Sequence, residues 1–158
     1  MVTRLASDAR SLFKTAEVEA QSSRSPVVEA EHLLLAIAKQ PGSDAGQLLA
    51  SVGLTHSEVL KALEREFEAS LAAAGVSVTV ASLARPTPGP GHRVRLGASF
   101  KAAMARSVTA AAGSPRIRPE HLLLGILAAE QGTLPRALRL AGVDQAELAA
   151  LAARALAQ

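Results

Sequence analysis

The sequence has no cysteine, no tryptophan and no tyrosine, and only three phenylalanines among its 158 residues. Without cysteine the chain cannot form disulfides, thiolate zinc sites or cysteine nucleophiles, which fits a reducing compartment. With so few aromatic rings it lacks platforms for stacking bases or sugars. No apolar run approaches the roughly 18 residues of a membrane span, and the first residues form a charged amphipathic stretch rather than a signal-peptide core. These absences predict a cytoplasmic protein with no membrane partner.

Alanine and leucine dominate instead, with 34 and 23 residues. Both lead the helix propensity scale, whereas the β-branched and aromatic residues that favour strands are scarce. The composition therefore predicts an all-α fold. A chain of this length suits one domain, or two small ones that share a core. It can bury about 68–70% of its unfolded surface without a metal or disulfide staple, and we expect no cofactor.

Charge is spread unevenly along the chain, whose net charge is +3. Residues 1–79 contain 7 basic and 10 acidic side chains, a net charge of −3, whereas residues 80–158 contain 10 basic and 4 acidic ones, a net charge of +6. A basic half can meet nucleic acid or an acidic partner. It is also the ordinary solvated face of an arginine-rich protein, so nucleic acid is an alternative partner rather than the expected one.

An internal repeat relates the two halves. Residues 25–37 and 114–126 are identical at eight of 13 positions when shifted by 89 residues. Self-similarity at a fixed offset indicates a repeat architecture. We expect one repeat in residues 1–75, a linker in 76–95 and a second repeat in 96–158, together forming one domain. The same offset aligns Leu49 with Leu138, Gly53 with Gly142, Glu58 with Glu147, Leu5 with Val94, Ala9 with Ala98 and Ala16 with Ala105.

Each repeat is expected to contain four helices. In the first helix, residues 5, 9, 12, 16 and 20 share one apolar face, and Pro26 follows as a helix breaker. The run from Glu31 to Leu35 opens a short helix that is apolar around most of its girth, which favours a central position. Gly53 suits a left-handed cap at the end of the third helix. We expect the fourth helix to point Val59, Leu60, Leu63 and Phe67 inward.

Helix-capping and helix-breaking residues mark the ends of these helices. Thr55, three residues before Glu58, is a capping-box pattern, and Asp144 before Glu147 is its acidic variant in the second repeat. In the linker, residues 76–80 alternate as a short strand does. Residues 85–93 contain too many prolines and glycines for a helix and read as an exposed loop.

The duplicated Glu-His-Leu-Leu-Leu block, at residues 31–35 and 120–124, carries a family resemblance. With the glycine downstream of each copy, it resembles the Clp N-terminal repeat of AAA+ unfoldases such as ClpA, ClpB and ClpC. The resemblance covers nearly the whole chain and implies a double four-helix module that binds substrates and adaptor proteins. The phosphate-binding Gly-x-x-x-x-Gly-Lys-Ser/Thr loop is absent from this sequence, as is any nucleophile elbow. We therefore expect a free-standing N-domain that is not an enzyme.

The resemblance singles out Glu31 and Glu120, at equivalent helix starts. In ClpC-like N-domains the matching glutamate of each repeat pairs with the guanidinium of phosphorylated arginine, which a carboxylate can bind in a bidentate pair. The residues alone have a simpler explanation, because an acidic side chain in a first turn is stabilised by the helix dipole by roughly 0.3–1 kcal/mol.

The hydroxyl groups that help to hold the phosphate in the family are missing here. Arg95 offers a charged replacement in the second site only, so phosphoarginine stays an alternative ligand rather than the expected one. The family's Phe-Thr pair and the Thr before Glu-His are replaced by Leu5-Ala6 and Ala30 in one repeat and by Val94-Arg95 and Pro119 in the other.

Three other groups of residues are candidates for binding. His32 and His121 lack the i, i+4 spacing of a zinc helix, so we predict no metal site and expect them to cap or pack at the repeat core. The pairs Arg93/Arg95 and Arg116/Arg118 are anion contacts or solvated loop residues. A groove between the repeats would take an apolar segment, and its candidate lining is Leu5, Leu12, Val94 and Phe100, which core packing would also explain.

The sequence thus predicts a non-catalytic protein-binding module. Its partners would be substrate or adaptor proteins and a Clp ATPase, for which it would act as adaptor, decoy or regulator. The alternatives are a nucleic-acid-associated regulator that uses the basic half, and a small hydrolase without a visible motif.

Overall fold

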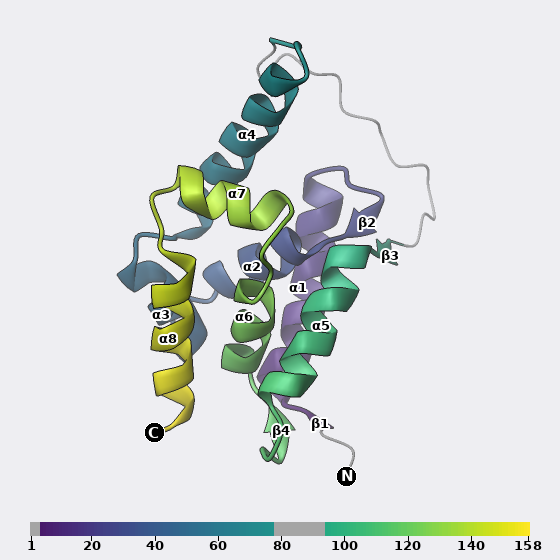
Figure 1. Ribbon diagram of the computed structural model, residues 1–158. Coiled ribbons are helices and arrows are strands. Elements are labelled where there is room, and N and C mark those ends of the chain that lie inside the picture. The colour runs from purple at the N-terminus through teal and green to yellow at the C-terminus, as the bar shows by residue number, and fades with distance from the viewer. Residues whose placement is uncertain (1–3, 78–93) are drawn as a thin grey trace.

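The computed structural model describes residues 4–77 and 94–158. Within them lie eight helices and four two-residue strands (Figure 1). The prediction of four helices per repeat is confirmed, and the expected exposed loop and most of the expected linker strand lie outside the described residues. The first repeat contains β1 (Arg4–Leu5), α1 (Ser7–Ser22), β2 (Val27–Val28), α2 (Ala30–Ala38), α3 (Asp44–Ser51) and α4 (His56–Ala73). The second contains β3 (Arg95–Leu96), α5 (Ala98–Ala110), β4 (Arg116–Ile117), α6 (Pro119–Leu127), α7 (Thr133–Leu140) and α8 (Gln145–Leu156).

The two apolar helices α2 and α6 occupy the centre of the bundle (Figure 1). All residues of α2 except Glu31 are buried, as are all residues of α6 except Leu124. A helix that is apolar around its girth must be covered on all sides. Helices α1 and α5 lie on one side of the pair, α3 and α8 on the other, and α4 and α7 across one end (Figure 1). The central position predicted for the Glu-His-Leu-Leu-Leu helices is therefore correct.

The short strands exchange partners between the repeats. Strand β1 pairs in parallel with β4, so that Arg4 lies opposite Arg116. Strand β3 pairs in parallel with β2, so that Arg95 lies opposite Val27. The first strand of each repeat thus pairs with the second strand of the other, and the repeats interlock into one domain.

The first helices of the two repeats correspond at an offset of 91 residues, not 89. The buried residues of α1 at 9, 12, 16 and 20 match those of the second repeat at 100, 103, 107 and 111. Leu5 of β1 therefore corresponds to Leu96 of β3, and the predicted pairing of Leu5 with Val94 is wrong. From the last matched buried residue, at 20 or 111, to the left-handed residue of the turn that follows, the second repeat is two residues shorter. These left-handed residues, Arg24 and Gly113, are again 89 residues apart.

Helix α4 buries only part of the face that was expected, since Val59 is buried and Leu63 packs against the core. Its buried residues are Val59, Ala62 and Glu66, whereas Leu60 and Phe67 are 37% and 45% exposed. The prediction that Leu60 and Phe67 point inward is wrong, because the side of α4 that carries Val59, Ala62 and Glu66 faces the bundle instead. The C-terminal half of α4, which carries Phe67, also projects beyond the bundle (Figure 1). None of the described helices is long and apolar enough to cross a membrane.

The predicted caps are confirmed. The hydroxyl of Thr55 accepts a hydrogen bond from the N–H of Glu58 at 3.4 Å, and the carboxylate of Asp144 accepts one from Glu147 at 3.1 Å. Gly53 and Gly142 adopt left-handed backbone conformations, with φ of 79° and 73°. Non-glycine residues rarely adopt this conformation, which explains why a glycine marks the same turn in both repeats.

Candidate functional site

The two histidines of the repeated block cap the central helices. The Nδ1 atom of His32 accepts a hydrogen bond from the N–H of Glu29 at 2.9 Å, and His121 does the same for Arg118 at 3.0 Å. An Nδ1 that accepts must be unprotonated, so both rings are neutral with their proton on Nε2. Each histidine therefore takes the place of the Glu or Gln that closes a capping box. The expectation that they cap the repeat core is confirmed.

Burial lowers the pKa of both rings. For His32, burial outweighs the nearby charges of Glu29 and Glu19, which raise its pKa. For His121, burial and the Arg118 charge lower the pKa against the opposing effect of Glu120. Among the described residues, no group of three His, Cys, Asp or Glu side chains is placed to hold a metal ion.

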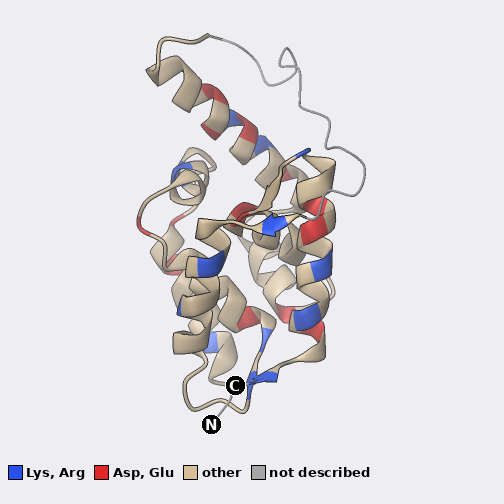
Figure 2. Ribbon diagram, turned by 90° about the vertical axis from the view of Figure 1, so that its right-hand side faces the viewer, with Lys and Arg blue, Asp and Glu red and all other residues tan. Residues whose placement is uncertain are grey.

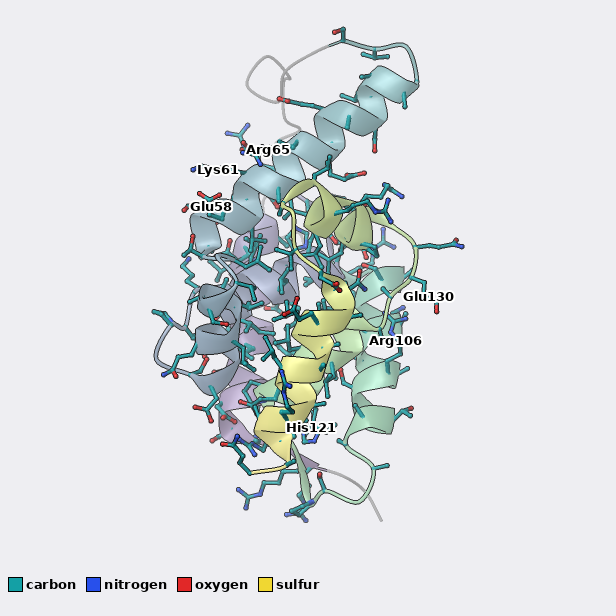
Figure 3. All side chains as sticks on the ribbon, turned by 60° about the vertical axis from the view of Figure 1, so that its left-hand side comes forward. Glu58, Lys61, Arg65, Arg106, His121 and Glu130 are labelled. Atoms are coloured by element: carbon teal, nitrogen blue, oxygen red, sulfur yellow. The ribbon has the colours of Figure 1, made fainter. Side chains whose placement is uncertain are left out.

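Glu31 lies beside an open cavity of about 440 Å³ between the starts of α2, α5 and α7. The cavity is lined by residues from both repeats, among them Glu29, Glu31, Ser99, Arg106 and Thr133. Arg106 is held in place because its Nε donates to the carbonyl of Gly125 at 2.8 Å. Figure 3 labels Arg106 on α5. The cavity therefore combines two carboxylates with one arginine that is already engaged.

Burial is the main cause that raises the pKa of Glu31, and the negative charges of Glu29 and Glu66 raise it further. Its own backbone N–H opposes this effect. Taking a carboxylate out of water disfavours its charged form, and a cation close to it restores that form. Glu31 is thus a carboxyl group for which a positively charged ligand would compensate the cost of ionisation.

Glu29 reaches from the first repeat to the N-terminus of α5 in the second. Its Oε2 accepts a hydrogen bond from the N–H of Ser99 at 3.1 Å and another from the Ser99 hydroxyl. The same hydroxyl also lies 2.9 Å from the N–H of Ala30, which donates to it. The carboxylate packs so closely on Gly97 that a Cβ there would lie 2.1 Å from Oε1. An anion-binding helix start is therefore occupied by a side chain of the same protein.

In the second repeat the corresponding acidic residue faces an arginine. Glu120 is 3% exposed, and its Oε2 lies 3.2 Å from Nε of Arg118. The contact is an ion pair without hydrogen-bond geometry, since this buried oxygen accepts no hydrogen bond from the described residues. Arg118 also lies 3.7 Å from Asp44 on α3. The guanidinium of Arg118 thus covers the only carboxylate that the sequence singled out in this repeat.

The two sites therefore differ although they share a motif. Glu29 and Arg118 hold the same place in the repeat, two residues before Glu31 and Glu120. Glu29 adds negative charge beside Glu31, whereas Arg118 neutralises Glu120. Glu29, Ser99 and Arg106 were not predicted from the sequence as residues of this site. The signal that could have found Glu29 is this reversal of charge inside an otherwise matching block.

The other residues that were predicted to bind a ligand lie partly in the core and partly at the surface. Leu12 and Phe100 are 1% and 3% exposed and belong to the core, so they offer no surface to a ligand. Phe100 packs edge-on against Phe13 with ring centroids 5.6 Å apart. Leu5 and Val94 are partly buried against the core, and Arg95 is exposed in β3. The structure does not bring these five residues together with Glu31 and Glu120 into one groove.

A family model described as the Clp repeat (R) N-terminal domain matches residues 4–114 and again residues 95–158. The chain belongs to this family. The resemblance of the Glu-His-Leu-Leu-Leu blocks is therefore confirmed, and both Clp repeats are present. Clp repeat domains are non-catalytic modules of Clp ATPases that bind substrates and adaptors.

Solved structures share the fold of this Clp repeat domain. The N-terminal domain of the caseinolytic protease associated chaperone ClpD from Arabidopsis thaliana matches with a TM-score of 0.68 and 21% identity, over 100% of this chain and 98% of that one. The Hsp104 N-terminal domain from Candida albicans matches with a TM-score of 0.65 and 14% identity, over 94% and 89%. A structure described as part of a malarial protein secretion system matches with a TM-score of 0.64 and 17% identity, over 96% of this chain and 93% of that one. A search of curated proteins found no significant match.

Proposed function

We propose that this Clp repeat domain recognises substrate or adaptor proteins and acts as an adaptor, decoy or regulator of a Clp chaperone-protease in the cytoplasm. It performs no chemistry itself. Family membership supports the class of function, and one observation supports the site. That observation is the cavity beside Glu31, where a half-buried carboxyl group lies between the two repeats and no cation among the described residues contacts it.

The ligand of this cavity is a basic side chain of a protein. A guanidinium or ammonium group would offset the burial of Glu31 and would meet Glu29 beside it. A phosphate on the same side chain would be repelled, because the Glu29 carboxylate already occupies the start of α5. The cavity thus favours plain arginine or lysine over phosphoarginine.

Peptide binding tests this proposal. Fluorescence anisotropy would compare three labelled peptides of one sequence that carry arginine, phosphoarginine or neutral citrulline at one position. We expect the arginine peptide to bind most tightly and Glu31→Gln to weaken it about tenfold or more. Glu58→Gln, at an exposed glutamate of α4, is the matched control. Equal binding of all three peptides would refute the site, and preference for phosphoarginine would reverse the ligand assignment.

The decoy or regulator role needs a separate measurement. We expect the full chain, added to a Clp ATPase with its peptidase, to slow or redirect degradation of a labelled protein substrate. Glu31→Gln should lose this effect while Glu58→Gln keeps it. An unchanged degradation rate with every substrate and adaptor tried would remove the regulatory role but leave the peptide site standing.

One observation favours the alternative, a nucleic-acid-associated regulator. Arg4 and Arg116 are neighbours across the β1–β4 pair, and like charges in such positions repel unless an anion lies between them. A gel shift with duplex and single-stranded DNA would test it. Binding that weakens steeply with salt, and weakens further in Arg116→Ala, would support this function. Absent or salt-insensitive binding would remove it.

A further inference from the structure

Helix α4 carries an apolar stripe that the described chain covers only in part, since Leu63 packs against the core. Leu60, Leu63, Phe67 and Leu71 recur at spacings of three and four residues, which places them on one side of the helix. Leu60 and Phe67 are exposed, and Leu63 and Leu71 are partly buried. The neighbouring stripe of Val59, Ala62 and Glu66 faces the bundle, and Arg136 of α7 anchors it through its Nε, 2.8 Å from Glu66.

Along the flank of this apolar stripe, basic and acidic side chains alternate, so that reading the helix backwards exchanges the signs of the charges. Lys61 and Arg65 are basic, and Glu64 and Glu68 are acidic. Acidic and basic segments alternate along α4 in Figure 2, and Lys61 and Arg65 point away from the bundle in Figure 3. Lys61 contacts Glu58 at 2.8 Å, but both side chains are exposed, so this pair holds Lys61 only weakly.

This charge order matches an antiparallel copy of the same helix. Antiparallel pairing centred between residues 64 and 65 brings Lys61 of each chain near Glu68 of the other, and Arg65 near Glu64. It also places Leu60 beside Leu71, and Phe67 beside Leu63. Parallel pairing would instead place the charged flanks of the two copies on opposite sides of the contact, where these charges could not pair with one another. The contact would be isologous, since the same patch serves both chains.

We propose that α4 is a homodimer interface, in which two copies of this chain pair antiparallel through Leu60, Leu63, Phe67 and Leu71. The C-terminal half of α4, which carries Phe67 and Leu71, stands clear of the other helices in Figures 1 and 3, so a second helix can reach it. Leu60, in the N-terminal half, is 37% exposed. This inference concerns a surface separate from the Glu31 cavity and does not depend on the proposed function.

Sedimentation equilibrium of the full chain tests the interface. We expect a monomer–dimer equilibrium over the micromolar range, and Phe67→Ser should weaken dimerisation about tenfold or more, as truncation of a central aromatic contact does. Val108→Ser is the matched control, because Val108 is 49% exposed on α5, and it should leave the equilibrium unchanged. A wild type that stays monomeric at every concentration would overturn the proposal, as would an equal effect of both variants.

Charge reversal tests the partner and its direction. Lys61→Glu/Arg65→Glu and Glu64→Lys/Glu68→Lys should each reduce self-association, and a mixture of the two variants should restore it. The chain has no cysteine, so single cysteines report proximity cleanly. Glu64→Cys at the centre should cross-link to itself on oxidation, whereas Ser57→Cys should not, because antiparallel pairing separates its two copies by roughly 22 Å. Cross-linking of Ser57→Cys, or dimers formed equally by each charge variant alone, would contradict antiparallel pairing.

Discussion

Glu29 and Ser99 join the two repeats across 70 residues of sequence, through hydrogen bonds from both the N–H and the hydroxyl of Ser99 to one carboxylate oxygen. Hydrogen bonds to a charged acceptor are about twice as strong as neutral ones. The start of α5 lacks any other side-chain cap, since its N-cap residue is Gly97. This contact therefore both caps a helix and fixes the position of one repeat against the other.

The first prediction concerns this link. Glu29→Gln and Ser99→Ala should each lower the free energy of unfolding, and the double variant should lose less than the sum, with a coupling of about 1–2 kcal/mol. Urea unfolding measures all four proteins. Asp8→Asn is the control, because Asp8 corresponds to Ser99 and its carboxylate accepts a hydrogen bond from the N–H of the adjacent Ala9, within the same repeat. Additive losses would mean that the two residues act separately.

The second prediction follows from the raised pKa of Glu31. A raised pKa favours the neutral carboxyl group in the folded state, so this group destabilises the fold as the pH rises through its folded pKa. Glu31→Gln should therefore raise the melting temperature at pH 7, and the gain should vanish below the ordinary value of 4.5. Thermal unfolding at several pH values measures this. A loss of stability at pH 7 would show that the Glu31 carboxylate stabilises the fold.

The third prediction concerns the capping histidines. Their folded pKa values lie below the ordinary 6.5, so the unfolded chain binds more protons in this range and stability falls as the pH drops below 6.5. Protonation of Nδ1 also removes the bond from the N-cap N–H. The double variant His32→Gln/His121→Gln keeps an acceptor at N3 and should flatten the loss between pH 6.5 and the folded pKa. An unchanged pH profile would assign the acid sensitivity to other groups.

The fourth prediction concerns Arg118. Arg118→Ala leaves the buried Glu120 carboxylate without its cation and should cost about 1–3 kcal/mol in urea unfolding. Adding Glu120→Gln should restore part of the loss because it removes the buried charge. Arg116→Ala, in the exposed part of β4, is the control and should change stability little. If Arg118→Ala and Arg116→Ala behave alike, the Arg118–Glu120 pair contributes no stability.

Much of the fold could be predicted from the sequence because its determinants are local. The spacing of alanine and leucine predicted α1, the apolar girth predicted the central α2 and α6, and Thr55, Asp144 and the two glycines marked helix ends. Each of these signals acts within one or two helical turns. The repeated block then showed that one arrangement is used twice, which also located Glu31 and Glu120.

The sequence alone determined a helical protein of two Clp repeats, the capped ends of several helices and the buried central helices, but it placed Leu5 on the first helix although Leu5 lies in β1. The tertiary structure decided which strands pair, which face of α4 is buried, and how the two candidate glutamates differ. Glu29 meets Ser99, and Arg118 covers Glu120, only after the repeats interlock. The spacing of apolar residues does not predict such contacts, because it shows which side of a helix is apolar but not which other segment packs against that side.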